Sequence, residues 1–135
     1  MRLTFALSAI LATVLAWPGP AVAGMSAAEF DAYTRGQTFH YGTAGAEPYG
    51  AEEYLPGRRV RWSFLDGECQ DGYWYADGPR ICFVYDTEPE PQCWQFERGS
   101  EGLEARFDGD DGVTELYEME KSRAPLTCPG PKIGV

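Results

Sequence analysis

The chain has 135 residues and carries 21 aspartate and glutamate side chains against 11 lysines and arginines, a formal net charge of −10 at pH 7. This balance argues against binding to nucleic acid or to anionic lipid headgroups, because both require a basic protein face. Solubility outside the cytoplasm is the simplest explanation of the acidity, and a preference for cationic partners is the alternative.

The N-terminus has the pattern of a secretory signal peptide. Arg2 supplies a positive charge, Leu3 to Trp17 form an uncharged run, and Ala21-Val22-Ala23 offers the small-x-small site of a signal peptidase. A membrane anchor is the alternative, but the run is shorter than the roughly 20 residues that span a bilayer, and a Pro-Gly-Pro break follows it. We expect residues 1–23 to be removed and residues 24–135 to form one domain, without a membrane span, in the periplasm or outside the cell.

Four cysteines lie in the expected mature chain. An even number of cysteines in a small exported domain predicts two disulfide bonds. Zinc binding is the alternative, but no C-x-x-C spacing occurs and His40 is the only histidine. We expect two structural disulfides and no metal or other cofactor.

The mature chain begins with a short predicted helix at Ser26–Arg35. Ser26 is a good N-cap, and Glu29 stands three residues later, where a capping-box partner belongs. Phe30 and Tyr33 lie on one face of this helix and are expected to dock it on the rest of the domain.

The remainder consists of short aromatic and β-branched runs separated by glycine, aspartate and proline, a pattern typical of strands and turns. We expect strands at Thr38–Tyr41, Tyr49–Tyr54, Arg59–Leu65, Cys69–Ala76, Arg80–Tyr85, Gln92–Glu97, Leu103–Phe107 and Val113–Met119. The acidic, proline-rich Thr87–Pro91 is expected to be a loop, and Ser122–Val135 an extended tail.

The register of neighbouring strands follows from the turns that connect them. A two-residue turn at Asp77-Gly78 places Trp74 opposite Ile81. A three-residue loop between the third and fourth strands places Trp62 opposite Gly72, where the missing side chain leaves room for the indole.

Pairing the fifth and sixth strands at Cys82 and Cys93 then places Ile81 opposite Trp94. All three turns point the same apolar side chains to one face of the sheet. These are Val60, Trp62, Phe64, Trp74, Ile81, Phe83, Trp94 and Phe96. A wrong parity at any turn would scatter them over both faces, so their agreement predicts an antiparallel meander with one aromatic face. We expect an all-β domain in which seven to eight strands curl into a small or partial barrel with a mostly filled interior.

In this register the cysteines point away from the aromatic face. Cys82 and Cys93 lie opposite each other and predict a cross-strand disulfide. Cys69 then remains for Cys128, in a bond that holds the tail against the outside of the meander. The competing connectivity, Cys69–Cys82 with Cys93–Cys128, joins positions that are four residues out of register and stays open as the alternative.

The sequence offers little for catalysis. His40 is the only histidine, and no G-x-S-x-G, P-loop or G-x-G-x-x-G motif occurs. Acidic pairs such as Glu52-Glu53 and Glu88/Glu90 are expected to be solvated surface charges. Asp108–Gly112 does not have the spacing of an EF-hand and is expected to be a hairpin turn. We therefore do not expect an enzyme.

A group of arginines and tyrosines is the best candidate for a binding surface. Arg59 and Arg61 alternate with inward residues and therefore point outwards. They are expected beside Tyr73 and Tyr75 of the next strand, with Arg80 close by; we call this set the Arg/Tyr face. Guanidinium stacking on the rings is the structural interpretation. Gripping a carboxylate, a sugar or a partner protein is the functional one, because arginine and tyrosine are frequent at binding hot spots.

Four motifs lie between Gly36 and Trp94. They are G-x-T-x-x-Y, Y-G-x-E-x-Y-L-P-G-R-R-V-x-W, D-G-x-W-Y-x-D-G-x-x-I-C-F and P-Q-C-W. The stretch, about half of the mature chain, resembles a group of small secreted bacterial proteins of unknown function with a G-x-W…C…C meander. The resemblance implies an exported β-meander in which Cys82 and Cys93 are bridged. It implies no activity and assigns no functional residues.

These observations favour an exported, non-catalytic module that binds a protein, an envelope glycan or a small ligand through the Arg/Tyr face or the mouth of the barrel. Two other hypotheses stay open. A small inhibitor would present an extended loop such as Thr87–Pro91 to the cleft of a secreted enzyme. An enzyme of unfamiliar type would use His40 or a pair of carboxylates in the mouth, and a buried carboxylate with a perturbed pKa near His40 would favour it.

Overall fold

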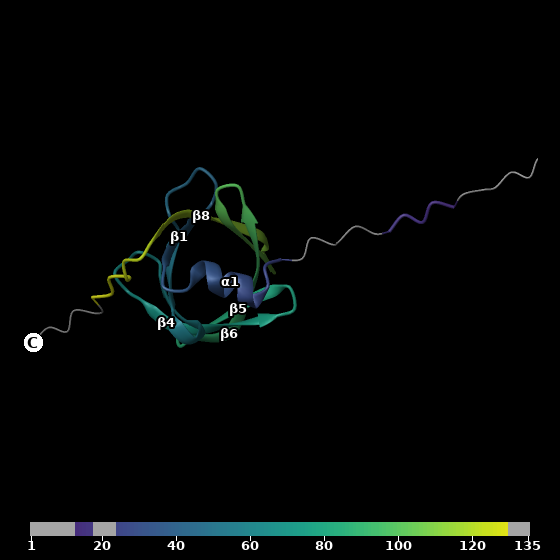
Figure 1. The fold of residues 1–135 in the computed structure, drawn as a ribbon. Coiled ribbons are helices and arrows are strands. Elements are labelled where there is room, and N and C mark those ends of the chain that lie inside the picture. The colour runs from purple at the N-terminus through teal and green to yellow at the C-terminus, as the bar shows by residue number, and fades with distance from the viewer. Residues whose placement is uncertain (1–12, 18–23, 130–135) are drawn as a thin grey trace, which may run out of the picture.

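A computed structural model describes residues 13–17 and 24–129, and within this part of the chain eight antiparallel strands form a closed barrel with one α-helix (Figure 1). The elements are α1 (Ala27–Thr34), β1 (Thr38–Gly42), β2 (Gly50–Leu55), a 3-10 turn (Pro56–Arg58), β3 (Arg59–Ser63), β4 (Gln70–Asp77), β5 (Arg80–Tyr85), β6 (Glu88–Gly99), β7 (Gly102–Gly109) and β8 (Gly112–Ser122). Each strand pairs with the next along the chain, and β8 returns to pair with β1. The all-β meander is thus confirmed, and it closes completely. The expected signal peptide lies outside the described residues except for 13–17.

The helix α1 closes one end of the barrel and is framed by the ring of strands in the view of Figure 1. Its capping box is formed as expected, because Ser26 Oγ accepts from the Glu29 amide and the Glu29 carboxylate accepts from the Ser26 amide. Phe30 is fully buried, with its ring centroid 5.1 Å from that of Trp74 and 4.6 Å from that of Phe96. The helix therefore acts as an aromatic plug for this half of the interior.

The predicted hairpin register between β4 and β5 is wrong by two residues. Trp74 lies opposite Phe83, and Asp77 opposite Arg80, so the turn is Gly78-Pro79 and not Asp77-Gly78. The physical reason is that proline has no N–H to give to a strand ladder, and this register keeps Pro79 in the turn. A shift of two residues preserves which side chains point inwards.

The register between β3 and β4 also differs by two residues, since Trp62 lies opposite Gln70 instead of Gly72. The expected three-residue loop is longer, because the hydroxyl of Ser63 donates to the Glu68 carbonyl and accepts from the Leu65 amide. The room for the Trp62 indole comes from Gly50, where a Cβ would clash with the ring.

The prediction of a loop at Thr87–Pro91 is wrong, because β6 begins at Glu88. Pro89 and Pro91 are tolerated there since the pairing with β5 shifts register in this stretch, and β6 pairs with β7 only from Gln95 onwards. Prolines are compatible with strands where one side of the backbone is unpaired.

The inward aromatic face is confirmed, but it is only half filled. Val60, Trp74, Ile81, Phe83 and Phe96 are buried in the core. Trp62 and Trp94 are partly buried, and Phe64 lies just beyond β3 with 46% of its surface exposed. The expectation of a mostly filled interior therefore holds near α1 and fails at the opposite end.

Both expected disulfides are confirmed, Cys82–Cys93 between directly opposed residues of β5 and β6, and Cys69–Cys128. The second bond holds the tail against the outside of the barrel. Thr38 Oγ1 donates to the Ala124 carbonyl over 2.7 Å, and the Glu53 carboxylate accepts from the Leu126 amide over 3.0 Å.

The tail explains why the outer side of β2 is buried, with Ala51 fully covered and Glu53 only 9% exposed. In the described part of the chain, no helix has the length and apolarity needed to cross a bilayer.

Candidate functional site

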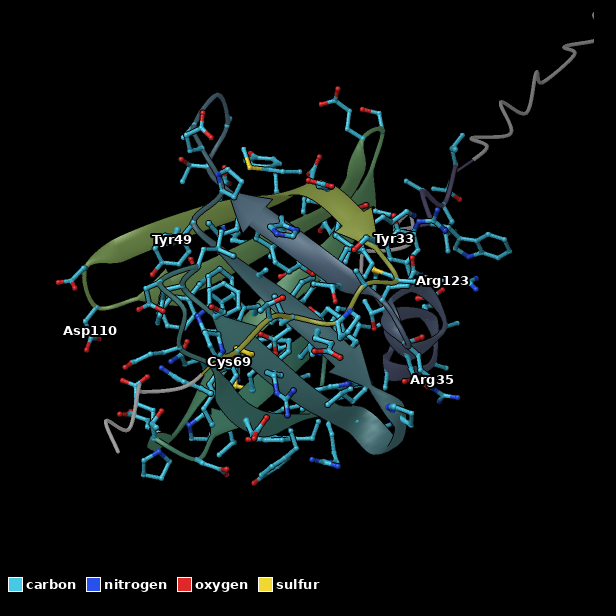
Figure 2. All side chains as sticks on the ribbon, turned by 90° about the vertical axis from the view of Figure 1, so that its left-hand side faces the viewer. Tyr33, Arg35, Tyr49, Cys69, Asp110 and Arg123 are labelled. Carbon is cyan, nitrogen blue, oxygen red and sulfur yellow. A yellow bond between two sulfur atoms is a disulfide. The ribbon has the colours of Figure 1, made fainter. Side chains whose placement is uncertain are left out.

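A cavity of about 370 Å³ occupies the end of the barrel opposite α1. Figure 2 shows Tyr49 and Asp110 at this open end and Tyr33 and Arg35 at the helix end. Its lining comes from all eight strands and from the loops before β2 and after β3, and consists of Tyr41, Thr43, Tyr49, Glu52, Tyr54, Trp62, Phe64, Gln70, Phe83, Tyr85, Glu88, Gln92, Trp94, Phe96, Ala105, Phe107, Thr114 and Leu116. Tyr54, Phe83 and Phe96 also pack on Phe30, so the helix plug supports the floor of the cavity.

Aromatic rings form the mouth of the cavity. Tyr49, Trp62 and Phe64 make a cluster in which the Phe64 ring is nearly perpendicular to both others, at centroid distances of 5.5 and 5.4 Å. We call these three residues the mouth cluster. On another part of the wall, the rings of Trp94 and Phe107 lie 5.1 Å apart. Large rings that are only partly buried, around a hollow interior, provide a surface for an apolar ligand.

A polar group lies on the inner wall between these rings. Glu52 is 2% exposed, and the Tyr85 hydroxyl lies 3.2 and 3.1 Å from its two carboxylate oxygens. The hydroxyls of Tyr41 and Tyr54 hydrogen-bond to each other over 2.9 Å. Tyr85 projects from β5, and it has room beside β4 because a Cβ at Gly72 would lie 2.9 Å from the Tyr85 ring.

Burial dominates the electrostatics of this group. It raises the pKa of Glu52 well above its usual range, and the hydrogen bond from Tyr85 only partly opposes this shift. Burial also raises the pKa values of Tyr41, Tyr54 and Tyr85, so these hydroxyls remain protonated at neutral pH. The site thus contains one carboxyl that gains a proton easily and three hydroxyls that donate or accept hydrogen bonds.

The expectation that Glu52-Glu53 are solvated charges is wrong for both residues. Glu52 faces the cavity, and Glu53 lies under the tail. Sequence reasoning missed Glu52 because the chain has 21 acidic residues, so no single glutamate stood out. The alternation along β2 contained the information, since Glu52 shares the parity of Tyr54 and lies opposite Trp62.

His40 does not contribute to the cavity. It lies opposite Ala51, whose side chain points away from the interior, and its Nδ1 atom is buried without a hydrogen-bond partner among the described residues. The cavity therefore has the buried carboxylate that an enzyme would need, but the histidine expected beside it lies on the other face of the sheet.

The structure places the Arg/Tyr face on the outside of β3, β4 and β5, away from the cavity. Arg59 lies opposite Tyr73, whose exposed fraction is 52%, and the rings of Tyr73 and Tyr75 are 6.4 Å apart. Arg61 is not beside Tyr73 or Tyr75 as expected, because its register partner is Asp71.

Two of the three arginines of this face, Arg61 and Arg80, are paired with acids and not with rings. Arg61 Nε donates to Asp71 over 2.8 Å, and Arg80 pairs with Asp77 over 3.3 Å. In the described part of the chain no guanidinium stacks on Tyr73 or Tyr75, and it is Arg58 that lies over an indole, that of Trp74, at 4.6 Å. Whether the Arg/Tyr face binds a partner stays a prediction.

Comparison with known proteins gave no match to this chain among protein-family models, curated proteins or solved structures. Its function therefore has to be inferred from the site.

Proposed function

We propose that this protein is an exported, non-catalytic binding module whose barrel takes up one small, mainly apolar organic molecule. The main observation behind this proposal is the cavity at the open end of the barrel. An eight-stranded barrel is just wide enough either to fill with side chains or to hold one small ligand. Here the helix fills one half, and the other half leaves about 370 Å³, within the roughly 300–1,000 Å³ typical of ligand sites.

The composition of the wall supports an apolar ligand with few polar contacts. Ten of the eighteen lining side chains are aromatic, whereas the deep polar groups are Glu52 and the hydroxyls of Tyr41, Tyr54 and Tyr85. A few buried polar groups within an apolar wall orient a ligand and select it. The two disulfides support export, because such bonds persist in oxidising compartments.

Two variants with the same chemical change test this proposal. Ala105 lines the cavity and is buried, whereas Ala76 is exposed and does not line it. We expect Ala105→Leu to occupy part of the cavity and weaken binding of the neutral probe 2-phenylethanol at least about tenfold, while Ala76→Leu leaves binding unchanged. The readout is the NMR signal of each indole N–H. Trp62 and Trp94 line the cavity, and the buried Trp74 serves as the internal reference.

The outcome is clear in either direction. Saturable shifts of the Trp62 and Trp94 signals, lost in Ala105→Leu alone, support a ligand cavity. A probe that shifts no indole signal, or one that binds both variants equally, contradicts it.

The Arg/Tyr face supports a second proposal, a contact with a protein or glycan of the cell envelope. Arg59 and Tyr73 are both exposed, and Arg59 forms no ion pair within the described residues. Affinity capture with the mature protein and with an Arg59→Ala/Tyr73→Ala variant tests it. A partner retained by the variant would exclude this face. The inhibitor hypothesis named Thr87–Pro91 as its extended loop, and Glu88–Pro91 of this segment belongs to β6.

A further inference from the structure

A buried carboxyl group beside an empty space requires an explanation. Glu52 is one of the most deeply buried side chains, and Tyr85 is its hydrogen-bonding side-chain partner in the described chain. Removing a carboxylate from water costs free energy unless a cation or several hydrogen bonds replace the water. Packing alone would be served better by an apolar residue at this position, since Phe39 and Trp62 flank Glu52 on the neighbouring strands. Tyr85 hydrogen-bonds to this carboxyl group, which faces the cavity, so a ligand there can supply a further partner.

The charges around the cavity indicate the sign of that partner. In the described part of the chain, the lining contains two acids, Glu52 inside and Glu88 at the mouth, and no lysine, arginine or histidine. A ligand carboxylate or phosphate would meet only negative charge. The chain as a whole, at −10, attracts cations towards the mouth.

The rings of the wall also suit a cation. Trp62 lies directly beside Glu52 in the sheet, and Tyr41, Tyr54 and Tyr85 surround the same carboxyl group. Aromatic faces attract ammonium groups, and they do so more strongly where water is excluded. Carboxylate and rings together can therefore replace the water lost by an organic ammonium ion.

We propose that the cavity binds a small organic cation, an amine with an aromatic or alkyl body, with its ammonium group at Glu52 and its body against the rings nearer the mouth. This inference rests on the proposed function, because it names the class of ligand for the same cavity. Binding is coupled to a proton. When the ammonium enters, Glu52 ionises, the N–H···O ion pair forms, and the carboxyl proton passes to the buffer, so charge is conserved.

Three probes of nearly equal shape separate charge from hydrophobicity: 2-phenylethylamine, 2-phenylethanol and phenylacetate. None absorbs where tryptophan is selectively excited, so fluorescence and the indole N–H signals both report binding. We expect the wild-type protein to bind the amine at least about tenfold more tightly than the alcohol, and phenylacetate most weakly. Calorimetry in two buffers of different ionisation enthalpy should show proton release with the amine and none with the alcohol.

Two glutamate variants locate the effect. Glu52→Gln keeps the shape of the side chain and removes its charge, so it should bind 2-phenylethanol as before and lose the preference for the amine. Glu88→Gln removes the exposed acid at the mouth and should keep that preference within about threefold, because exposed charges are screened.

The failure of this inference differs from the failure of the proposed function. If the alcohol binds as tightly as the amine, the cation is wrong and the ligand cavity stands. If Glu88→Gln loses the preference and Glu52→Gln does not, the ammonium group does not bind at Glu52, which overturns the inference as stated. If none of the probes shifts the Trp62 or Trp94 signals, the cavity itself is not a binding site. Should Glu52→Gln fail to fold, the preference of the wild-type protein among the three probes decides, and equal binding of the amine and the alcohol overturns the inference.

Discussion

The two halves of the barrel share the same strands and the same inward parity, yet one is filled and the other is hollow. At the helix end, Phe30 enters the interior and contacts the rings of four core residues. At the open end none of the described elements enters the interior, and the large rings of the wall surround the cavity. The difference shows that the barrel itself does not decide whether its interior is core or site; the short helix does.

The halves also differ in charge. Cations rest on rings at the helix end, with Arg58 over Trp74 and both Arg98 and Lys121 over Tyr33. The cavity at the other end has only acids among its charged lining residues, as far as the chain is described. Cations of the chain itself thus lie against rings at the helix end, whereas at the open end the proposed ligand would supply the cation.

The largest expected effect comes from removing the plug. Phe30→Ala should lower the free energy of unfolding by about 3–5 kcal/mol, because it leaves a void among buried rings. Phe64→Ala, at the exposed mouth, should cost no more than about 1 kcal/mol. Urea denaturation of both variants measures the difference. Equal losses would mean that the two ends contribute alike to stability.

The next effect concerns the tail that covers the outer wall behind the cavity. Cys69 and Cys128 are 59 residues apart and close the longer of the two disulfide loops. Replacing both with serine should lower the free energy of unfolding by about 4 kcal/mol in the chain-entropy model. Opening Cys82–Cys93, 11 residues apart, should cost about 3 kcal/mol. Hydrogen exchange should accelerate around Ala51 and Glu53 only in the first variant. Protection that persists there would show that the tail binds without its disulfide.

A smaller effect, of either sign depending on pH, is expected from Glu52→Gln. Because the pKa of Glu52 is raised in the fold, the folded state holds this proton more tightly than the unfolded chain does. The stabilisation that protonated Glu52 gives to the fold is complete below the ordinary glutamate pKa of 4.5. It is lost as the pH rises through the pKa of Glu52 in the folded protein. The groups that face it, Tyr41, Tyr54 and Tyr85, remain neutral over this range.

The glutamine variant should therefore gain stability relative to the wild-type protein between acid and neutral pH, by about 1–3 kcal/mol at the neutral end. Thermal unfolding at pH 4 and pH 7.5 gives the measurement. A constant difference between the two proteins at both pH values would show that Glu52 does not titrate with folding.

The smallest effect tests the closed end. Arg58→Ala removes the cation over Trp74 and should cost about 0.5–1 kcal/mol. Arg58 has a positive φ of 59°, but alanine meets the same backbone constraint, so the comparison isolates the side chain. Arg59→Ala, on the exposed outer face, serves as the control and should change little.

Much of the fold followed from local pattern. The helix start at Ser26, the bounds of β5, the inward parity and the Cys82–Cys93 pair were predictable, because each depends on neighbours in sequence or on period-two alternation. The pairing of strands was wrong by two residues at two turns, where Pro79 and the side-chain bonds of Ser63 decided the turn. Parity survived these errors because a shift of two leaves every side chain on its own face.

The site was less predictable than the fold. The Arg/Tyr face was chosen by residue type, whereas the cavity depends on how deep the helix enters. The burial of Glu52 depends on β2 lying between β1 and β3 in a closed barrel. A glutamate that shares its face of a strand with a glycine and a tyrosine looks the same in sequence whether that face is solvated or enclosed.

By itself the sequence determined the class of fold, the alternation of inward and outward side chains, and the pairing of the cysteines opposite each other on β5 and β6. These properties are local, since they depend on chain geometry over a few residues. Only the tertiary structure decided that the barrel closes, that Phe30 fills one half, and that a carboxyl group faces the empty half. Those outcomes depend on volume and solvent exclusion, which result from all the strands together and belong to no single segment.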